Sequence, residues 1–256
     1  MARIAVIGLG EAGAELARDL SRAGAAVVGF DPAVARLDGL EVAGAAPDAV
    51  RGAEVVLSVN AASVAVAVAE SVASALDRDA VFADLNTSSP AAKRAVAAVV
   101  TPGGARFADV ALMAPVAGRG LRTPALASGP GAERFAAVVG GLGMPVTAIG
   151  PEPGDAAARK LVRSVFMKGL AAAIGEALEA AERLGARDEL YDDIAATLAG
   201  ADAALLARLV EGSVRHAGRR AEEMAAARAM LDELGVEPRI AGASEAWLRS
   251  LGGADE

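Results

Sequence analysis

The sequence has no cysteine, a single histidine (His216) and only 3% aromatic residues. The absence of cysteine excludes disulfides, thiolate nucleophiles and cysteine-ligated zinc or iron–sulfur sites. A chain with one histidine cannot form the usual histidine-rich metal site, so we expect no metal ion. With so few aromatic residues, the core must be built mainly from Ala, Val and Leu.

The chain also lacks an excess of positive charge. Its 25 Lys and Arg residues are outnumbered by 33 Asp and Glu residues, which leaves a formal net charge of -8. No overall field draws such a protein to polyanions, so nucleic acid and anionic membranes are poor partner candidates. The first apolar run ends at Gly8, too early for a signal peptide or a membrane span. We expect a soluble, cytoplasmic protein.

Apolar residues are abundant. A hydrophobic fraction of 54% with 23% charged residues excludes a disordered chain. As far as about residue 150, β-branched runs alternate with Ala-rich stretches of helical length, which predicts an α/β fold, a doubly wound Rossmann sheet of parallel strands. The expected strands are residues 3–7, 26–30, 55–59, 80–84, 106–112 and 146–149, with a further candidate at 124–128, and the expected helices are residues 13–23, 63–76 and 90–99.

The pattern changes at residues 151–154, where two prolines and a glycine can continue neither a strand nor a helix. We therefore expect a dinucleotide-binding domain at residues 1–151 and an all-α substrate and dimerisation domain at residues 152–256. The second domain opens with a long interdomain helix over residues 155–184. A second long helix is expected over residues 203–234, with a break near Gly212.

A glycine-rich motif follows the first expected strand and opens the first helix. Its pattern is G-x-G-x-x-G, with Gly8 for a tight turn, Gly10 for close approach of a pyrophosphate and Gly13 for packing of the helix on the strand. The N–H groups at the start of the helix attract phosphate. The motif predicts a cofactor site whose contacts are Gly8, Leu9, Gly10, Glu11, Ala12 and Gly13.

An acidic residue, Asp31, ends the second expected strand. It follows the first glycine at about the spacing of 20 residues at which a carboxylate binds the ribose hydroxyls of NAD and repels a 2′-phosphate. Two alternatives stay open. Asp31, which Pro32 follows, could be a helix N-cap and nothing more, and Arg36 could bind a 2′-phosphate. We favour NAD over NADP.

With these segments in hand, the chain resembles the β-hydroxyacid dehydrogenase superfamily, which includes 3-hydroxyisobutyrate dehydrogenase and 6-phosphogluconate dehydrogenase. The resemblance covers nearly the whole chain. It is carried by residues 7–24 (cofactor fingerprint), 84–90 (nicotinamide side), 109–118 (substrate loop) and 154–160 (start of the helix with the catalytic lysine). Residues 167–170 and 216–224 resemble a less characterised bacterial branch.

The resemblance implies roles for individual residues. Asn60 and Asn86 are expected cofactor contacts, Pro115, Val116, Ala117 and Gly118 line the substrate loop, and Lys160 with Ser164 forms the catalytic pair. Two positions depart from the family, which usually has Ser at position 117 and Asn at position 164. The reaction type therefore carries over while the usual substrates do not. The helical domains of the family pair into dimers, which would bury apolar helix faces.

Lys160 has a chemical task in such an enzyme. The cofactor moves the hydride, so the protein must move a proton and orient the alcohol. A lysine acting as base needs its pKa lowered by burial or by neighbouring cations, whereas an ammonium acting as acid does not. Ser164 and Lys168 recur on the same helix face, with Arg163 beside them, so this face could bind an anionic substrate. The alternative is a solvated basic stripe.

A second basic cluster lies later in the chain. His216 and Arg220, with Arg219 and Glu223, share part of one helix surface and could bind a substrate anion or form a network of ion pairs. Taken together, the sequence predicts an NAD(P)-dependent oxidoreductase acting on a small anionic 3-hydroxy acid or similar alcohol. The alternatives are an imine reductase, in whose family the lysine position usually holds Asp or Tyr, and a dinucleotide sensor without turnover.

Overall fold

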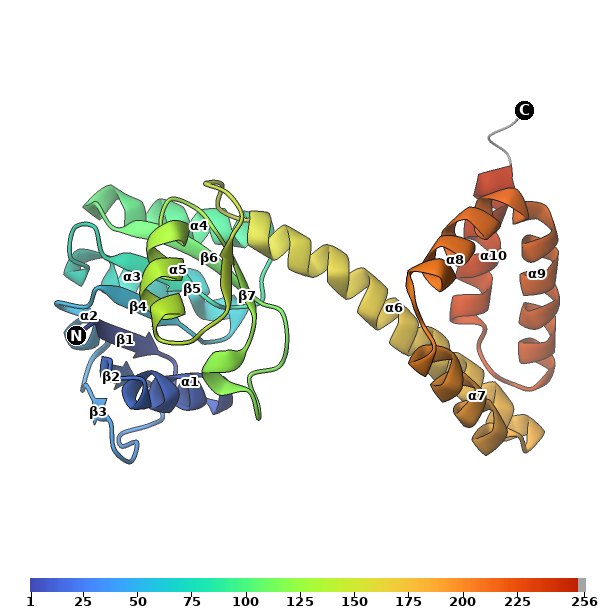
Figure 1. Cartoon of the computed structure of the whole chain (residues 1–256), viewed down its shortest axis with the longest axis horizontal. Helices are drawn as coiled ribbons and strands as arrows, with labels where there is room; N and C mark the ends of the chain where they lie inside the picture. The colour runs from blue at the N-terminus through green and yellow to red at the C-terminus, as the bar shows by residue number, and fades with distance from the viewer. Residues whose placement is uncertain (253–256) are drawn as a thin grey trace. The chain divides into compact units, whose positions relative to one another are not determined.

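The computed structural model describes residues 1–252, and the chain divides into two compact units, Met1–Arg163 and Ser164–Glu256 (Figure 1). Helix α6 (Asp155–Leu184) starts in the first unit and continues in the second. Its bounds match the helix expected from the sequence. The compact units divide inside α6, further along the chain than the domain boundary proposed at residues 151–152.

The first unit is built on one eight-stranded sheet in the order β3-β2-β1-β4-β5-β6-β7-β8. The strands are β1 (Arg3–Ile7), β2 (Ala26–Phe30), β3 (Glu41–Val42), β4 (Val55–Ser58), β5 (Val81–Asp84), β6 (Arg106–Leu112), β7 (Ala125–Ser128) and β8 (Val146–Ala148). The Rossmann-like α/β fold predicted from the sequence is confirmed. Its parallel pattern fails at one pair, because β7 runs antiparallel to β6. The loop between β6 and β7 contains no crossover helix, and two parallel strands can be joined only by such a crossover.

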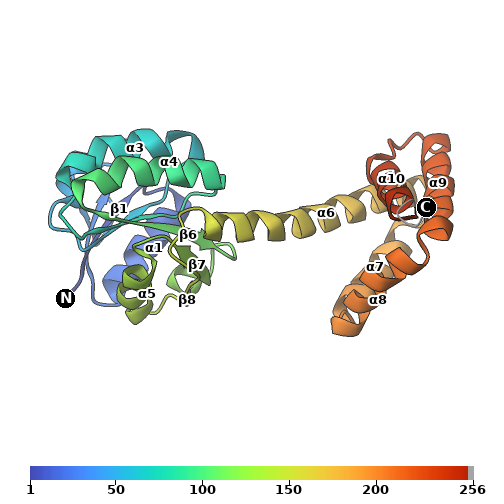
Figure 2. The same ribbon diagram turned by 90° about the horizontal axis from the view of Figure 1, so that it is seen from above.

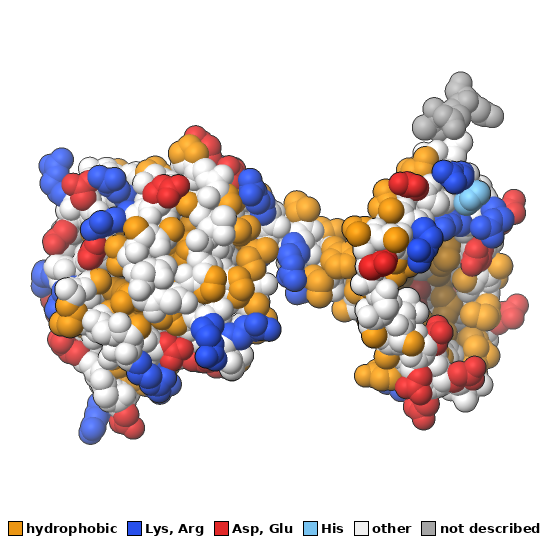
Figure 3. Space-filling model, viewed as in Figure 1, with side chains coloured by type: hydrophobic (Ala, Val, Ile, Leu, Met, Phe, Trp, Pro, Cys, Tyr) orange, Lys and Arg blue, Asp and Glu red, His pale blue; other side chains and the backbone are white. Residues whose placement is uncertain are grey.

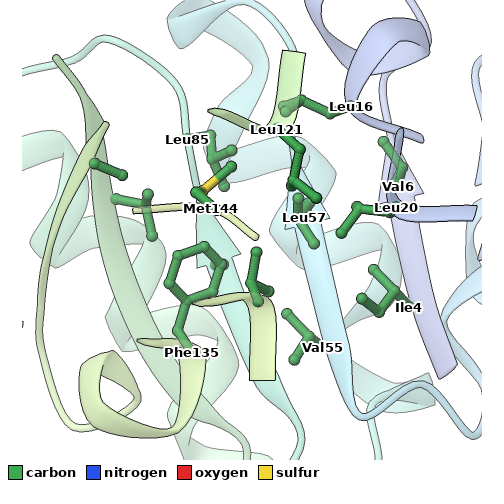
Figure 4. Close-up of a cluster of buried hydrophobic side chains, with 14 of the residues drawn as sticks. Ile4, Val6, Leu16, Leu20, Val55, Leu57, Leu85, Leu121, Phe135 and Met144 are labelled. Atoms are coloured by element: carbon green, nitrogen blue, oxygen red, sulfur yellow. The ribbon is translucent and has the colours of Figure 1, made fainter. Parts of the chain in front are cut away.

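Helices cover both faces of this sheet (Figure 2). Alternating side chains of each strand supply two cores: Ile4 and Val6 pack on one face, Ala5 and Ile7 on the other. The first core, under α1 (Glu11–Arg22) and α5 (Ala132–Gly141), is drawn in Figure 4. The second lies under α2 (Ala46–Val50), α3 (Ala65–Val72) and α4 (Pro90–Val100). Short 3-10 turns are η1 (Ala62–Val64), η2 (Ala73–Ala75), η3 (Thr101–Gly103) and η4 (Gly120–Arg122).

The second unit is helical, as expected. Besides the later turns of α6 it contains α7 (Arg187–Ala199), α8 (Ala203–Arg215), α9 (Ala217–Glu233) and α10 (Arg239–Gly252). Helices α9 and α10 lie side by side (Figure 1). The Glu176 carboxylate of α6 accepts the backbone N–H groups of Ile240 and Ala241 at 2.7 and 2.8 Å, which caps the start of α10.

The expected helix over residues 203–234 is two helices, α8 and α9. The break falls at His216, whose φ of -121° and ψ of 29° are not helical, rather than near Gly212. Gly212 lies inside α8, and its missing Cβ makes room for Arg220, whose guanidinium would lie 2.9 Å from a Cβ there. Among the described residues, no helix is long and apolar enough to cross a membrane.

Candidate functional site

The glycine turn between β1 and α1 has the geometry that its sequence predicts. Gly8 has a positive φ of 100°, and a Cβ there would lie 2.1 Å from the Val59 carbonyl oxygen. A Cβ at Gly13 would lie 1.9 Å from the Gly8 carbonyl oxygen. Gly10 is exposed with open space around it, and as the N-cap of α1 it provides no side-chain cap. The N–H groups of the first turn of α1 are therefore presented to an incoming anion.

Asp31 ties the end of β2 to this turn. Its Oδ2 accepts the Leu9 N–H and its Oδ1 accepts the Ala33 N–H, both at 2.8 Å. No described helix starts at Asp31, so the helix-cap alternative is wrong. The carboxylate closes a turn instead and lies beside the glycine loop. Arg36 is exposed nearby, in a hollow of about 290 Å³ lined by residues 35–40 and 42.

Three polar side chains meet at the carboxyl ends of β4 and β5. The Asn86 amide nitrogen donates to Asn60 Oδ1 at 3.0 Å, and the Asn60 N–H donates to Asn86 Oδ1 at 2.6 Å. Both amide groups also donate to the Ser58 hydroxyl. The two asparagines expected to contact the cofactor therefore lie together. They are at the carboxyl-terminal edge of the sheet, where the glycine turn follows β1.

A buried ion cluster, which the sequence reasoning missed, lies behind these residues. The Lys93 ammonium of α4 is 3.2 Å from Asp84 Oδ2 and 3.3 Å from Asp109 Oδ1, and all three side chains are at most 1% exposed. Lys93 also donates to the Asp84 carbonyl at 2.7 Å. Burial raises the pKa of Asp84, and the Lys93 charge opposes that rise. One feature of the sequence could have indicated the two carboxylates of this cluster: the tripeptide Phe-Ala-Asp occurs at residues 82–84 and again at residues 107–109.

The start of α6 is fastened to the same cluster. Asp109 Oδ2 accepts the Ala157 N–H at 2.9 Å, and the Ser128 hydroxyl accepts the Ala156 N–H at 3.0 Å. One helical turn further, Lys160 donates from Nζ to the Thr87 hydroxyl at 2.8 Å. Lys160, Thr87 and Asn86 border one small pocket with Lys93 and Asp109. The sequence analysis named Lys160 and Asn86 but did not single out Thr87, which is exposed between them.

The loop after β6 contains the expected substrate residues. Pro115, Ala117 and Gly118 are exposed, whereas Val116 is 6% exposed and packs into the core. The loop is held on α1, because Asp19 Oδ2 accepts the Leu121 N–H at 3.0 Å. It is therefore attached to the helix that begins at the glycine turn.

The expected catalytic residue Ser164 and the other expected substrate residues are distributed over both units. Arg163 is exposed at the end of the first unit, and Ser164, Lys168, His216 and Arg220 belong to the second. His216 is exposed between α8 and α9. Arg220 donates to the Ser213 hydroxyl at 2.7 Å, so it is engaged within its own unit. Figure 3 shows Lys and Arg side chains gathered around the single His of this unit.

Comparison with known proteins identifies both parts of the chain. Residues 3–129 match the family described as the NAD binding domain of 6-phosphogluconate dehydrogenase, and residues 181–251 match a domain of unknown function, DUF1932. An uncharacterized 28.5 kDa protein of Methanothermus fervidus is 28% identical over 144 residues. That match covers 56% of this chain and 55% of the curated relative, so it spans about half of its length.

Solved structures extend the comparison to nearly the full chain. A conserved hypothetical protein from Sinorhizobium meliloti 1021 is 32% identical, with 97% of this chain and 88% of that chain covered and a TM-score of 0.65. A conserved protein of unknown function, described as structurally similar to 3-hydroxyacid dehydrogenases, is 29% identical, with 99% and 98% covered and a TM-score of 0.65.

An imine reductase from Myxococcus stipitatus in complex with NADP+ shares the fold, at a TM-score of 0.84 with 98% and 94% covered, but only 21% identity. The fold, the family matches and the full-length relatives agree with the resemblance seen in the sequence. The chain therefore joins an NAD-binding domain of the 6-phosphogluconate dehydrogenase type to a DUF1932 domain, and it is structurally similar to 3-hydroxyacid dehydrogenases.

Proposed function

We propose that this protein is an NAD(P)-dependent oxidoreductase that transfers a hydride between a nicotinamide cofactor and a small anionic 3-hydroxy acid or similar alcohol. The observation that carries the proposal is the Lys160 amine, which donates to Thr87 at the carboxyl ends of β5 and β6. Ligands of open α/β sheets bind at this edge. The glycine turn and the paired asparagines belong to the same edge, so cofactor contacts and a proton-transferring amine occur in one unit.

The residues of the glycine turn fit a dinucleotide. Its pyrophosphate would bind the uncapped start of α1, where Gly10 leaves open space. Asp31, held beside the turn by the Leu9 N–H, supports NAD over NADP because its charge repels a 2′-phosphate. When bound, the nicotinamide supplies the hydride chemistry.

Lys160 is proposed as the general acid and base. In reduction its ammonium gives a proton to the substrate oxygen, and in oxidation the neutral amine takes that proton back. The Thr87 hydroxyl accepts a hydrogen bond from Nζ and so orients the amine. Ser164, in place of the family's Asn, is proposed as a second polar group of the catalytic pair.

Binding of an anionic substrate is proposed for the loop at residues 115–118 and for the cations Arg163 and Lys168. These two side chains are exposed and follow Lys160 along α6. His216 and Arg220 remain candidates for the same role, although the guanidinium of Arg220 already donates to Ser213. Loss of the family's Ser at position 117 supports a substrate other than the usual ones.

The test starts with fluorescence titration of NADH and NADPH, followed by a turnover screen with 3-hydroxy acids and with cyclic imines. We expect Lys160→Met to lower kcat at least 100-fold while NADH affinity stays within threefold, as removal of a general acid or base requires. Arg94→Met, an exposed position on α4, is the control and should leave both quantities unchanged.

The other outcomes favour the alternatives. Unchanged kcat in Lys160→Met would remove the lysine from the mechanism. Turnover of imines alone would favour an imine reductase, the activity named for several solved structures with the same fold. Tight NADH binding with no turnover of either class would favour a sensor.

We also propose that two copies of the chain associate through the helical unit. Leu206, Leu209, Val210 and Val214 are 54–62% exposed and share one face of α8. An apolar groove of about 400 Å³ between α6, α9 and α10, lined mainly by Ala, Leu and Met, adds to the surface that a second copy would cover. Small-molecule substrates are the only other partners we propose, and the cytoplasmic location stays a prediction.

A further inference from the structure

Four polar residues form a buried row across the first unit's sheet. In the register of the strands, Ser58 pairs with Asp84, Asp84 with Asp109, and Asp109 with Ser128. Each of these residues is at most 1% exposed. Neighbouring residues of one row point to the same face of a sheet, so their side chains meet on the face that α4 covers. Lys93 of α4 reaches into the middle of the row.

Burial of the ion cluster of Lys93, Asp84 and Asp109 costs free energy. Each charge loses its hydration, and apolar residues of the same volume would often be at least as stable. Stability alone therefore does not explain the cluster. Its geometry suggests another role, because each carboxylate is shared between the lysine and a different segment of the candidate site.

One carboxylate holds the segment after β5. Asp84 Oδ1 accepts the Asn86 N–H at 2.9 Å, and the next residue is Thr87, the acceptor of the Lys160 bond. The other carboxylate holds the start of α6, because Asp109 Oδ2 accepts the Ala157 N–H one turn before Lys160. Both ends of the Lys160–Thr87 contact are thus tied to Lys93 through one carboxylate each.

We propose that Lys93 is a positioning residue that sets the Lys160 amine against Thr87 and Asn86. The catalytic part of this inference rests on the proposed function of Lys160. The positional part does not, because the bonds from Asp84 to Asn86 and from Asp109 to Ala157 exist whether or not Lys160 transfers a proton.

The positional part predicts a pattern of amide hydrogen exchange, measured residue by residue by NMR. In Lys93→Met the N–H groups of Asn86 and Ala157 should both exchange at least tenfold faster. In Asp109→Asn the Ala157 N–H alone should do so, because a hydrogen bond to a charged acceptor is stronger than one to a neutral amide. The N–H groups within β1 should stay within twofold of the original chain, and Arg94→Met should change none of them.

The catalytic part predicts a split between kinetic constants on any substrate that the screen identifies. Lys93→Met should lower kcat at least tenfold with the KM for NADH within threefold, and it should change kcat less than twofold when Lys160 is already Met. An additive loss would instead assign Lys93 a role independent of Lys160 and would overturn the inference.

Two further results would overturn it. In the first, amide exchange is faster throughout the unit, β1 included, or NADH binding is lost in both Lys93→Met and Asp109→Asn. Either outcome would mean that the cluster is needed for the stability of the whole fold. Unchanged exchange at Asn86 and Ala157 in Lys93→Met would show that the carboxylates hold these segments without it. If Lys160→Met keeps full turnover while the exchange pattern appears, the proposed function fails and the positional role stands.

Discussion

Asp31 divides its two carboxylate oxygens between the glycine turn and its own loop. Oδ2 holds the Leu9 N–H and Oδ1 holds the Ala33 N–H. The residue therefore contributes to cofactor preference in two ways, through its charge and through the shape that it gives the turn. A substitution that removes both would mix the two effects, so the charge must be changed with the shape kept.

Asp31→Asn keeps an oxygen acceptor at this position and removes the negative charge. We expect the ratio of the NADPH to the NADH dissociation constant to fall at least tenfold, because the repulsion of a 2′-phosphate is lost; a tenfold change is about 1.4 kcal/mol. Asp31→Ala should weaken NADH more than NADPH and, by releasing Leu9, weaken both. Fluorescence titration of the two reduced cofactors measures these constants. A larger loss for NADPH than for NADH would reverse the preference for NAD.

The loop between β6 and β7 depends on α1 for its shape. Val116 and Leu121 pack into the core beside Leu16 and Leu20 of α1, and Figure 4 shows Leu121 among the labelled side chains. Gly120 has a positive φ of 53°, and a Cβ there would lie 1.8 Å from Asp19 Oδ2. This is the oxygen that accepts the Leu121 N–H.

Gly120→Ala should therefore lower the free energy of unfolding by about 2–4 kcal/mol. The left-handed backbone costs a residue with a Cβ roughly 1–2 kcal/mol, and displacement of Asp19 leaves the Leu121 N–H without its acceptor, which costs a similar amount. Gly118→Ala is the matched control, because its φ is also positive but a Cβ there meets nothing within 4 Å. Urea unfolding of both variants compares the two, and equal losses would contradict the role of Asp19.

At the scale of the whole molecule, the helical unit leaves apolar side chains exposed that do not pack into its own core. Its buried cluster is small, formed by Ala180, Leu231, Val236 and Ala241. By contrast, one whole face of α8 is exposed and apolar, and Trp247 of α10 is 54% exposed. Apolar faces of this kind mark association sites more often than solvent-facing surfaces.

We expect the protein to have twice the monomer mass in solution, measured by light scattering coupled to size exclusion. Leu209→Glu should shift it to the monomer mass at micromolar concentration, because a charge would have to be buried in the interface. Arg208→Glu, which places the same side chain on the opposite face of α8, should leave the mass unchanged. A monomeric original chain, or an unchanged Leu209→Glu variant, would contradict association through α8.

Local patterns in the chain were enough to predict β1, the glycine turn, β2 and Asp31, because strand alternation, glycine spacing and the acid after β2 all act over short distances. The start of α6 followed in the same way from the prolines and glycine that precede it. Helices α2, α5, α7 and α10 were not predicted individually, although α7 and α10 lie in the part of the chain that was expected to be all-helical.

Long-range pairing decided the rest. Asp109 is far from Asp84 and Lys93 in the sequence and meets them only because β5 and β6 pair in register beneath α4. The same register brings Thr87 and Lys160 together, since one follows β5 and the other starts from a helix fastened to β6. A sequence shows which residue types are available, but the contacts of a buried charge depend on which strands become neighbours, and that is a property of the folded sheet.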